Sequence, residues 1–158
     1  MAAFPDVKNR SWDFSVDFTM PAADASGTLV TQGGNDNGWG LFLFGGVPTF
    51  VYKTNNLPGN QWRVAGARLG AGRHTADLHV VADSAAPGAG AMVSLVVDGA
   101  AAASTHVGAT VPYGFQGSDG VGIGRDFIST LSSDYTLPFR FPGEIGPVRI
   151  HLRGSLSR

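Results

Sequence analysis

The chain has 158 residues, enough for one domain that buries a sizeable core without a metal ion or a disulfide. Charged residues make up 15% and hydrophobic residues 43%, a balance that excludes an intrinsically disordered chain. The net charge is −1 and no basic run occurs, so nucleic-acid binding would lack its electrostatic source. We therefore expect a single domain over residues 1–158 that does not bind nucleic acid.

The sequence contains no membrane-spanning segment and no cysteine. No apolar stretch approaches the length of a membrane span, and the first residues lack the basic start and apolar centre of a signal peptide. Zero cysteines exclude disulfides, thiolate zinc sites and cysteine nucleophiles together. These features predict a soluble protein that has no membrane partner.

The predicted elements are all strands. Only one Glu and two Lys occur, and the alanines lack a 3.6-residue period, so little helix is expected. Trp12, Phe14, Val16 and Phe18 alternate with polar residues, which is typical of a half-buried strand. The expected strands, in chain order, are 12–18, 28–32, 39–44, 47–53, 61–67, 74–80, 92–97, 100–106, 121–124 and 143–152.

Turn signals join several of these strands into antiparallel pairs. Asp98-Gly99 suits a two-residue turn in which both φ angles are positive, and Gly45-Gly46 predicts a second hairpin. Trp39 lies in phase with Leu41 and Leu43, which gives the strand over 39–44 an apolar face. Together the pattern predicts an all-β, two-sheet antiparallel jelly-roll sandwich with almost no helix.

The hairpin over 94–99 resembles that of the concanavalin A-like lectin/laminin-G superfamily. An ordered series of further motifs resembles the C-terminal β-sandwich domain of bacterial arylsulfatases, and this resemblance covers residues 9–152. The motifs are 72–75, 111–115, 121–126, 133–135, 138–141 and 143–145. The cysteine-based catalytic motif of sulfatases is missing, so the resemblance implies a relative of the accessory domain and not a sulfatase.

Residue patterns for catalysis are also missing. Glu144 is the single Glu, so the paired carboxylates of a glycoside hydrolase are not available on one strand. No Gly-x-Ser-x-Gly elbow occurs, and the four histidines lack the two-residue spacing that a metal site on one strand face requires. We expect a protein that is not an enzyme and that requires no cofactor.

Loop carboxylates form the first candidate site. Lectin-like relatives often hold calcium, which is bound by loop carboxylates and carbonyls. Asp119, Asp126 and Asp134 are the candidate calcium ligands. The alternative is that these residues were selected by turn geometry, because Asp and Asn are favoured in tight turns.

Aromatic residues form the second candidate site. Of Trp39, Tyr52, Trp62 and Tyr113, we single out Trp62 because Gln61 and Arg63 flank it. Trp62, Tyr52 and Arg63 are therefore the candidate ligand-binding residues, since an aromatic face can stack on a sugar ring. The alternative is that Trp62 fills the core and Tyr52 caps it. In either case strict alternation would turn Arg63 to the opposite face of the sheet from Trp62, unless a bulge near residues 57–59 re-aims it.

Three functions follow. The first is a non-catalytic binding or interaction module similar to the accessory domain of arylsulfatases. The second is a lectin-like protein for anionic or sulfated glycans, which Arg63, Arg68 and Arg73 could meet. The third is an enzyme of unrecognised mechanism. Partners would be a glycan, a protein or a second copy, because few charged residues guard the open sheet edges and these favour a homodimer.

Overall fold

The computed structural model describes residues 5–115, 121–126 and 129–153, and these contain strands but no helix. No helix that could cross a membrane is therefore found in that part of the chain. The strands are β1 (Trp12–Met20), β2 (Gly27–Gly33), β3 (Gly38–Phe44), β4 (Val47–Lys53), β5 (Gln61–Ala65), β6 (Gly72–Ala82), β7 (Ala91–Val97), β8 (Ala100–Val107), β9 (Val121–Ile123) and β10 (Glu144–Leu152).

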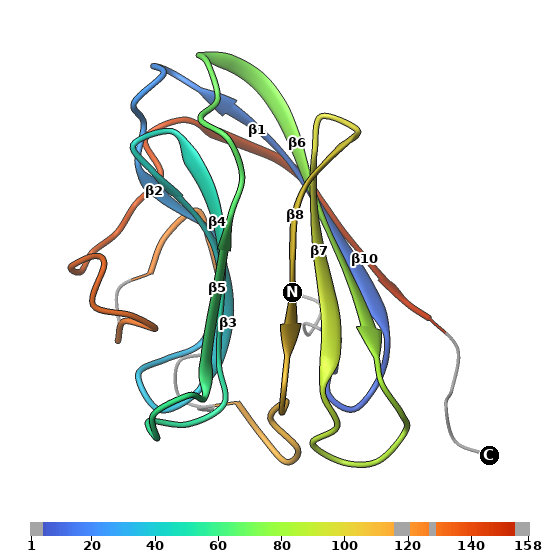
Figure 1. The fold of residues 1–158 in the computed structure, drawn as a ribbon. Coiled ribbons are helices and arrows are strands. Elements are labelled where there is room, and N and C mark those ends of the chain that lie inside the picture. Colours follow the sequence, from blue (N-terminus) through green and yellow to red (C-terminus); the bar gives the residue numbers. More distant parts are fainter. Residues whose placement is uncertain (1–4, 116–120, 127–128, 154–158) are drawn as a thin grey trace.

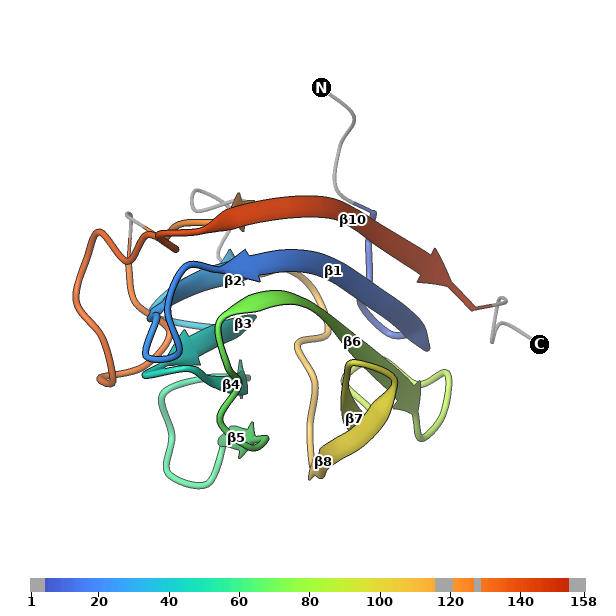
Figure 2. The ribbon, with the colours of Figure 1, turned by 90° about the horizontal axis from the view of Figure 1, so that it is seen from above.

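The strands form two five-stranded antiparallel sheets that face each other (Figure 1). The first sheet has the order β10-β1-β6-β7-β8, and the second has the order β5-β4-β3-β2-β9. Viewed along the sandwich, both sheets curve, and β5 meets β8 along one side (Figure 2). The sequence-based expectation of a two-sheet jelly roll is confirmed.

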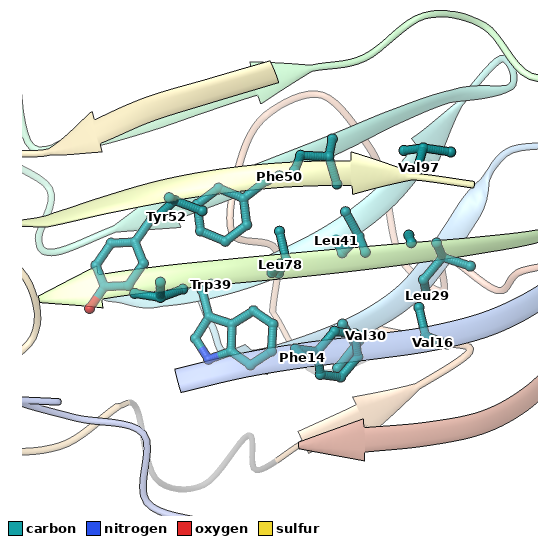
Figure 3. Packing of buried hydrophobic residues seen from close by; sticks show 14 of the residues in the cluster. Phe14, Val16, Leu29, Val30, Trp39, Leu41, Phe50, Tyr52, Leu78 and Val97 are labelled. Atoms are coloured by element: carbon teal, nitrogen blue, oxygen red, sulfur yellow. The ribbon is translucent and has the colours of Figure 1, made fainter. Parts of the chain in front are cut away.

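The main core lies between the sheets (Figure 3). The side chains that fill it alternate along strands such as β1, whereas the neighbours Leu29 and Val30 of β2 both enter the core at a register shift. In β1 the inward positions are Trp12, Phe14, Val16 and Phe18, as their alternation predicts. Trp39 on β3 is fully buried, with its ring centroid 4.9 Å from that of Trp12 and 5.8 Å from that of Phe14. One face of each sheet therefore supplies the core.

Two of the predicted turns have the expected backbone. Asp98 and Gly99 have φ angles of 52° and 80°, so both lie in the left-handed region that a two-residue hairpin of this type requires. Gly45 and Gly46 connect β3 to β4 with φ angles of 56° and 79°. The carbonyl oxygen of Ala23 would lie 2.0 Å from a Cβ at Gly46, so a side chain does not fit there.

The outer face of the second sheet is covered by residues 129–141, which we call the cover segment. Phe42 and Val51 point outward from the sheet and are buried beneath Leu131 and Tyr135 of the cover segment. Phe139 adds a ring stacked on that of Tyr135 at 4.8 Å. This second, smaller core explains why a strand face pointing away from the main core is apolar.

Candidate functional site

A cleft opens at the end of the sandwich where β1 and β7 begin and β6 and β8 end, the lower end in Figure 1. Its walls are the residues before β1, the β6–β7 loop and the segment after β8. The space that it encloses is about 20 Å³, room for about one or two water molecules, so it is a shallow depression that a larger ligand would cover. The cleft is lined by Val7, Lys8, Asn9, Arg10, Trp12, Tyr52, Val80, Ala82, Ser84, Ala89, Ala91, Thr110 and Phe115.

Asn9 ties the three walls of the cleft together. Its Nδ2 donates to the carbonyl of Pro112 at 2.9 Å, and its Oδ1 accepts from the backbone N–H of Gly88 at 2.9 Å. Its φ of 58° lies in the left-handed region, which Asn tolerates better than most residues. Thr110 reinforces the join because its hydroxyl donates to the carbonyl of Ala89 at 2.6 Å. The cleft is therefore a hydrogen-bonded structure and not a gap between independent loops.

Aromatic rings form the inner wall of the cleft. Tyr52 on β4 is buried, and its hydroxyl accepts the backbone N–H of Val111 at 2.8 Å. Its ring meets Phe115 edge-on at 6.4 Å and Trp62 at 6.5 Å. Burial raises the pKa of the Tyr52 phenol, and the hydrogen bond from Val111 only partly offsets this. Tyr52 is thus neutral at physiological pH and serves as a rigid wall.

Tyr113 projects from the segment that forms the outer wall. It is 87% exposed, more than any other large apolar side chain in the described part of the chain. Its backbone is held on both sides, because Asn9 binds the carbonyl of Pro112 and the Nδ2 of Asn37 donates to the carbonyl of Gly114 at 3.3 Å. Tyr113 is therefore a solvent-facing ring on a hydrogen-bonded stretch of backbone beside the cleft.

Two cations line the same cleft. The Nζ of Lys8 lies 5.8 Å from the ring centroid of Phe115 and 2.7 Å from Oδ1 of Asp6. The hydrogen bond from the Lys8 ammonium, then that from its backbone N–H, lowers the pKa of Asp6, and the charge of Arg10 adds to this effect. The Nε of Arg10 is buried and has no hydrogen-bond partner among the described residues. The site therefore carries donors that the protein does not fully use.

The structure separates the three aromatic-site candidates. Tyr52 and Trp62 oppose each other across β4 and β5, as expected, but Tyr52 is buried and Trp62 is half-buried against the main core. Arg63 points to the other face of the sheet, where it pairs with Asp134 and lies 5.1 Å from the ring centroid of Phe44. The expectation that Arg63 neighbours Trp62 in one site is wrong, because the β4–β5 register continues without a bulge.

The candidate calcium ligands do not form a visible set. Asp119 lies outside the described residues. Asp126 is buried and accepts the hydroxyl of Tyr135 at 2.5 Å, whereas Asp134 pairs with Arg63. Within residues 5–115, 121–126 and 129–153, no group of three His, Cys, Asp or Glu side chains is arranged to hold a metal ion. Calcium binding thus stays a prediction.

Three histidines each pair with one aspartate on the first sheet. The pairs, with their nitrogen–oxygen distances, are His74–Asp98 at 2.7 Å, His79–Asp13 at 2.7 Å and His106–Asp83 at 2.8 Å. In His74 the second ring nitrogen, Nε2, lies 2.7 Å from the carbonyl oxygen of Gly70. Both partners of His74 only accept hydrogen bonds, so the doubly protonated imidazolium satisfies both contacts.

We expect His74 to make the stability of the protein depend on pH. Burial opposes its charged form, but the hydrogen bonds to Asp98 and Gly70 and the charge of Asp98 outweigh burial and raise the pKa of His74. A raised folded-state pKa stabilises the protein fully below about pH 6.5, and that contribution is lost as the pH rises through the folded-state value. Urea unfolding should therefore show a free energy of unfolding that decreases from pH 6 to pH 8.

The substitution His74→Gln should remove most of this decrease, because glutamine does not titrate. His106→Gln is the matched control, since the exposed His106–Asp83 pair has side chains that are each 47% exposed. A pH slope that His74→Gln leaves unchanged would contradict the assignment.

The architecture and the cleft define an all-β, two-sheet antiparallel sandwich with a depression at one end. No protein-family model and no curated protein matches the chain. Solved structures do. Domains LG4-5 of the mouse laminin alpha1 chain match with a TM-score of 0.65 and 16% identity, covering 92% of this chain and 36% of that chain. This chain thus spans about a third of that laminin structure.

Two further structures extend the comparison. The CBM40 domain of the Ruminococcus gnavus IT-sialidase matches with a TM-score of 0.63 and 17% identity, covering 95% of this chain and 79% of that one. The LG1-3 region of the laminin alpha2 chain matches with a TM-score of 0.60 and 12% identity, covering 98% and 31%. Likeness at this level of identity establishes the shared sandwich fold.

Proposed function

We propose that the protein is a non-catalytic carbohydrate-binding module that binds its ligand over the end cleft, with Tyr113 as a stacking platform. The exposure of Tyr113 beside the cleft carries the proposal. A sugar ring has an apolar face that packs on an aromatic ring, while its hydroxyl groups need polar partners nearby. Asn9 and Thr110 line the cleft and supply such partners.

The fold comparison supports this reading. The same CBM40 domain, solved bound to alpha2,3 sialyllactose, matches this chain with a TM-score of 0.62 and 16% identity. A sandwich of this shape can therefore carry a glycan site. In the setting that the arylsulfatase resemblance implies, such a module would hold an attached enzyme near its substrate. The homodimer expected from open sheet edges stays part of the proposal, with light scattering as its test.

A glycan array, probed with and without calcium, tests the function directly. Wild-type protein should bind a defined subset of glycans, and Tyr113→Ala should weaken that binding about tenfold, equivalent to about 1.4 kcal/mol. The melting temperature should not change, because an 87% exposed ring contributes little to the core. Leu57→Ala is the matched control, since Leu57 is also exposed, at 64%, but has no ring.

Two results would oppose the proposal. If the protein binds no glycan on the array, with or without calcium, the carbohydrate-binding function is ruled out. Glycan binding that Tyr113→Ala leaves unchanged would keep the function but would move the ligand away from Tyr113.

A further inference from the structure

We propose that Lys8 and Arg10 form an anion subsite in the end cleft, and that this subsite selects glycans carrying a carboxylate or a sulfate group. The inference rests on the proposed function, because the sugar part of the ligand must lie over the same cleft. The two cations come from one short segment, with Asn9 between them fixing the backbone against the other walls.

Lys8 is held in place and has donors to spare. Its side chain is only 19% exposed, and its ammonium lies over the edge of the aromatic wall at Phe115. An ammonium group has three N–H donors, and Asp6 is its one hydrogen-bonded acceptor among the described residues. Because the stem is already ordered, an anion that reaches the ammonium costs little further side-chain entropy.

Arg10 offers the complementary geometry. Its buried Nε makes no hydrogen bond within the described part of the chain, so one donor of the guanidinium is unsatisfied. The edge formed by Nε and a terminal nitrogen matches the two oxygens of a carboxylate or a sulfate. An acceptor that reaches this edge after rotation of the Arg10 side chain, with the backbone still held by Asn9, would satisfy a donor that the fold leaves unused.

Asp6 occupies the anion position in the absence of ligand. Its side chain is 70% exposed, and it accepts from both Nζ and the backbone N–H of Lys8, at 2.7 Å and 3.0 Å. An exposed carboxylate two residues away can swing into solvent and be replaced by a ligand anion. Asp6 therefore acts as an internal competitor whose removal raises affinity.

Other arginines are engaged elsewhere. Arg63 pairs with Asp134 on the outer face of the second sheet, and Arg149 pairs with Asp17 on the first sheet. Arg73 stands near the start of β6, at the opposite end of the sandwich from the cleft. The anion-binding arginines suggested by the sequence, Arg63, Arg68 and Arg73, are thus not among the residues that line the cleft, whereas Lys8 and Arg10 line it.

The test is calorimetry with three sugars that share one core: lactose, 3′-sialyllactose and 3′-sulfolactose. Wild-type protein should bind at least one of the two acidic sugars about tenfold more tightly than lactose at low salt. Lys8→Met and Arg10→Gln should each remove most of that preference and leave the affinity for lactose unchanged. Asp6→Asn should strengthen binding of the acidic sugar. Arg73→Gln, which removes the same charge at the far end, should change nothing.

The outcomes separate the two proposals. If lactose binds as well as both acidic sugars, and neither Asp6→Asn nor Lys8→Met alters any affinity, the anion subsite is wrong and the carbohydrate module stands. If none of the three sugars and no glycan on the array binds, the proposed function fails and the subsite fails with it. Preference for only one acidic sugar supports the subsite and identifies its anion. If Lys8→Met or Arg10→Gln unfolds the protein, Asp6→Asn still tests the subsite. Asp6 is exposed, and its substitution should raise the affinity for the acidic sugar.

Discussion

Replacing Trp39 with Ala should lower the free energy of unfolding by about 4 kcal/mol, the usual cost of removing a fully buried Trp. The indole contacts Trp12 and Phe14 between the sheets, and its Nε1 donates to Oε1 of Gln32 at 2.9 Å. The substitution leaves both a cavity and an unpaired amide oxygen. Since small domains unfold at a cost of about 5–15 kcal/mol in total, the variant should be close to the limit of folding.

Urea unfolding followed by circular dichroism measures this loss, because fluorescence changes when any Trp is removed. Trp39→Phe should restore about half of the stability, since it refills most of the cavity and leaves only the hydrogen bond unmade. Trp62→Ala is the second comparison, and it should cost clearly less because Trp62 is half-buried at the edge strand β5. A loss below about 1 kcal/mol for Trp39→Ala would contradict the placement of this ring at the centre of the core.

The fold was predictable because its signals are local. Alternation along β1, the Asp98-Gly99 turn and the in-phase positions of Trp39, Leu41 and Leu43 each depend on neighbours within a few residues. Those signals declare which face of a strand is apolar. They do not indicate which segment covers an apolar face that points away from the main core. Phe42 is an example, since residues 131 and 135 cover it.

The site was less predictable for the same reason. Polar neighbours in the sequence favour exposure of Trp62, yet Trp62 packs against the core and Tyr113 is the exposed ring. Exposure depends on where the segment after β8 crosses the end of the sandwich, which Asn9 and Thr110 determine through hydrogen bonds to residues about 20 to 100 positions away. No residue pattern along the chain encodes such contacts.

Charge pairing shows the same limit. The sequence indicates Arg63 as a candidate for binding anions and Asp134 as a candidate for binding calcium, but the structure pairs the two across 71 positions. Lys8 and Arg10, in contrast, precede the first strand in a segment without periodicity. They line the cleft because Asn9 joins their segment to the other walls through long-range hydrogen bonds. The sequence alone does not predict those contacts.

The cover segment gives the second large effect. Tyr135→Phe should lower the free energy of unfolding by about 3 kcal/mol, because the lost hydroxyl serves two buried partners, one of them charged. It donates to Oδ2 of Asp126 at 2.5 Å and accepts the backbone N–H of Leu131 at 2.9 Å. Burial, followed by the hydrogen bond to Asp126, raises the pKa of Tyr135, so the hydroxyl stays neutral and keeps its proton for the carboxylate.

Tyr52→Phe is the matched control for this prediction, since both tyrosines are 7% exposed and both substitutions remove one oxygen atom. The hydroxyl of Tyr52 accepts one neutral backbone N–H, from Val111, so its removal should cost only about 1 kcal/mol. Urea unfolding of the two variants side by side therefore isolates the contribution of the Asp126 carboxylate. Equal losses would show that Asp126 does not depend on Tyr135, and that apolar packing of Leu131 and Phe139 alone holds the cover segment on the sheet.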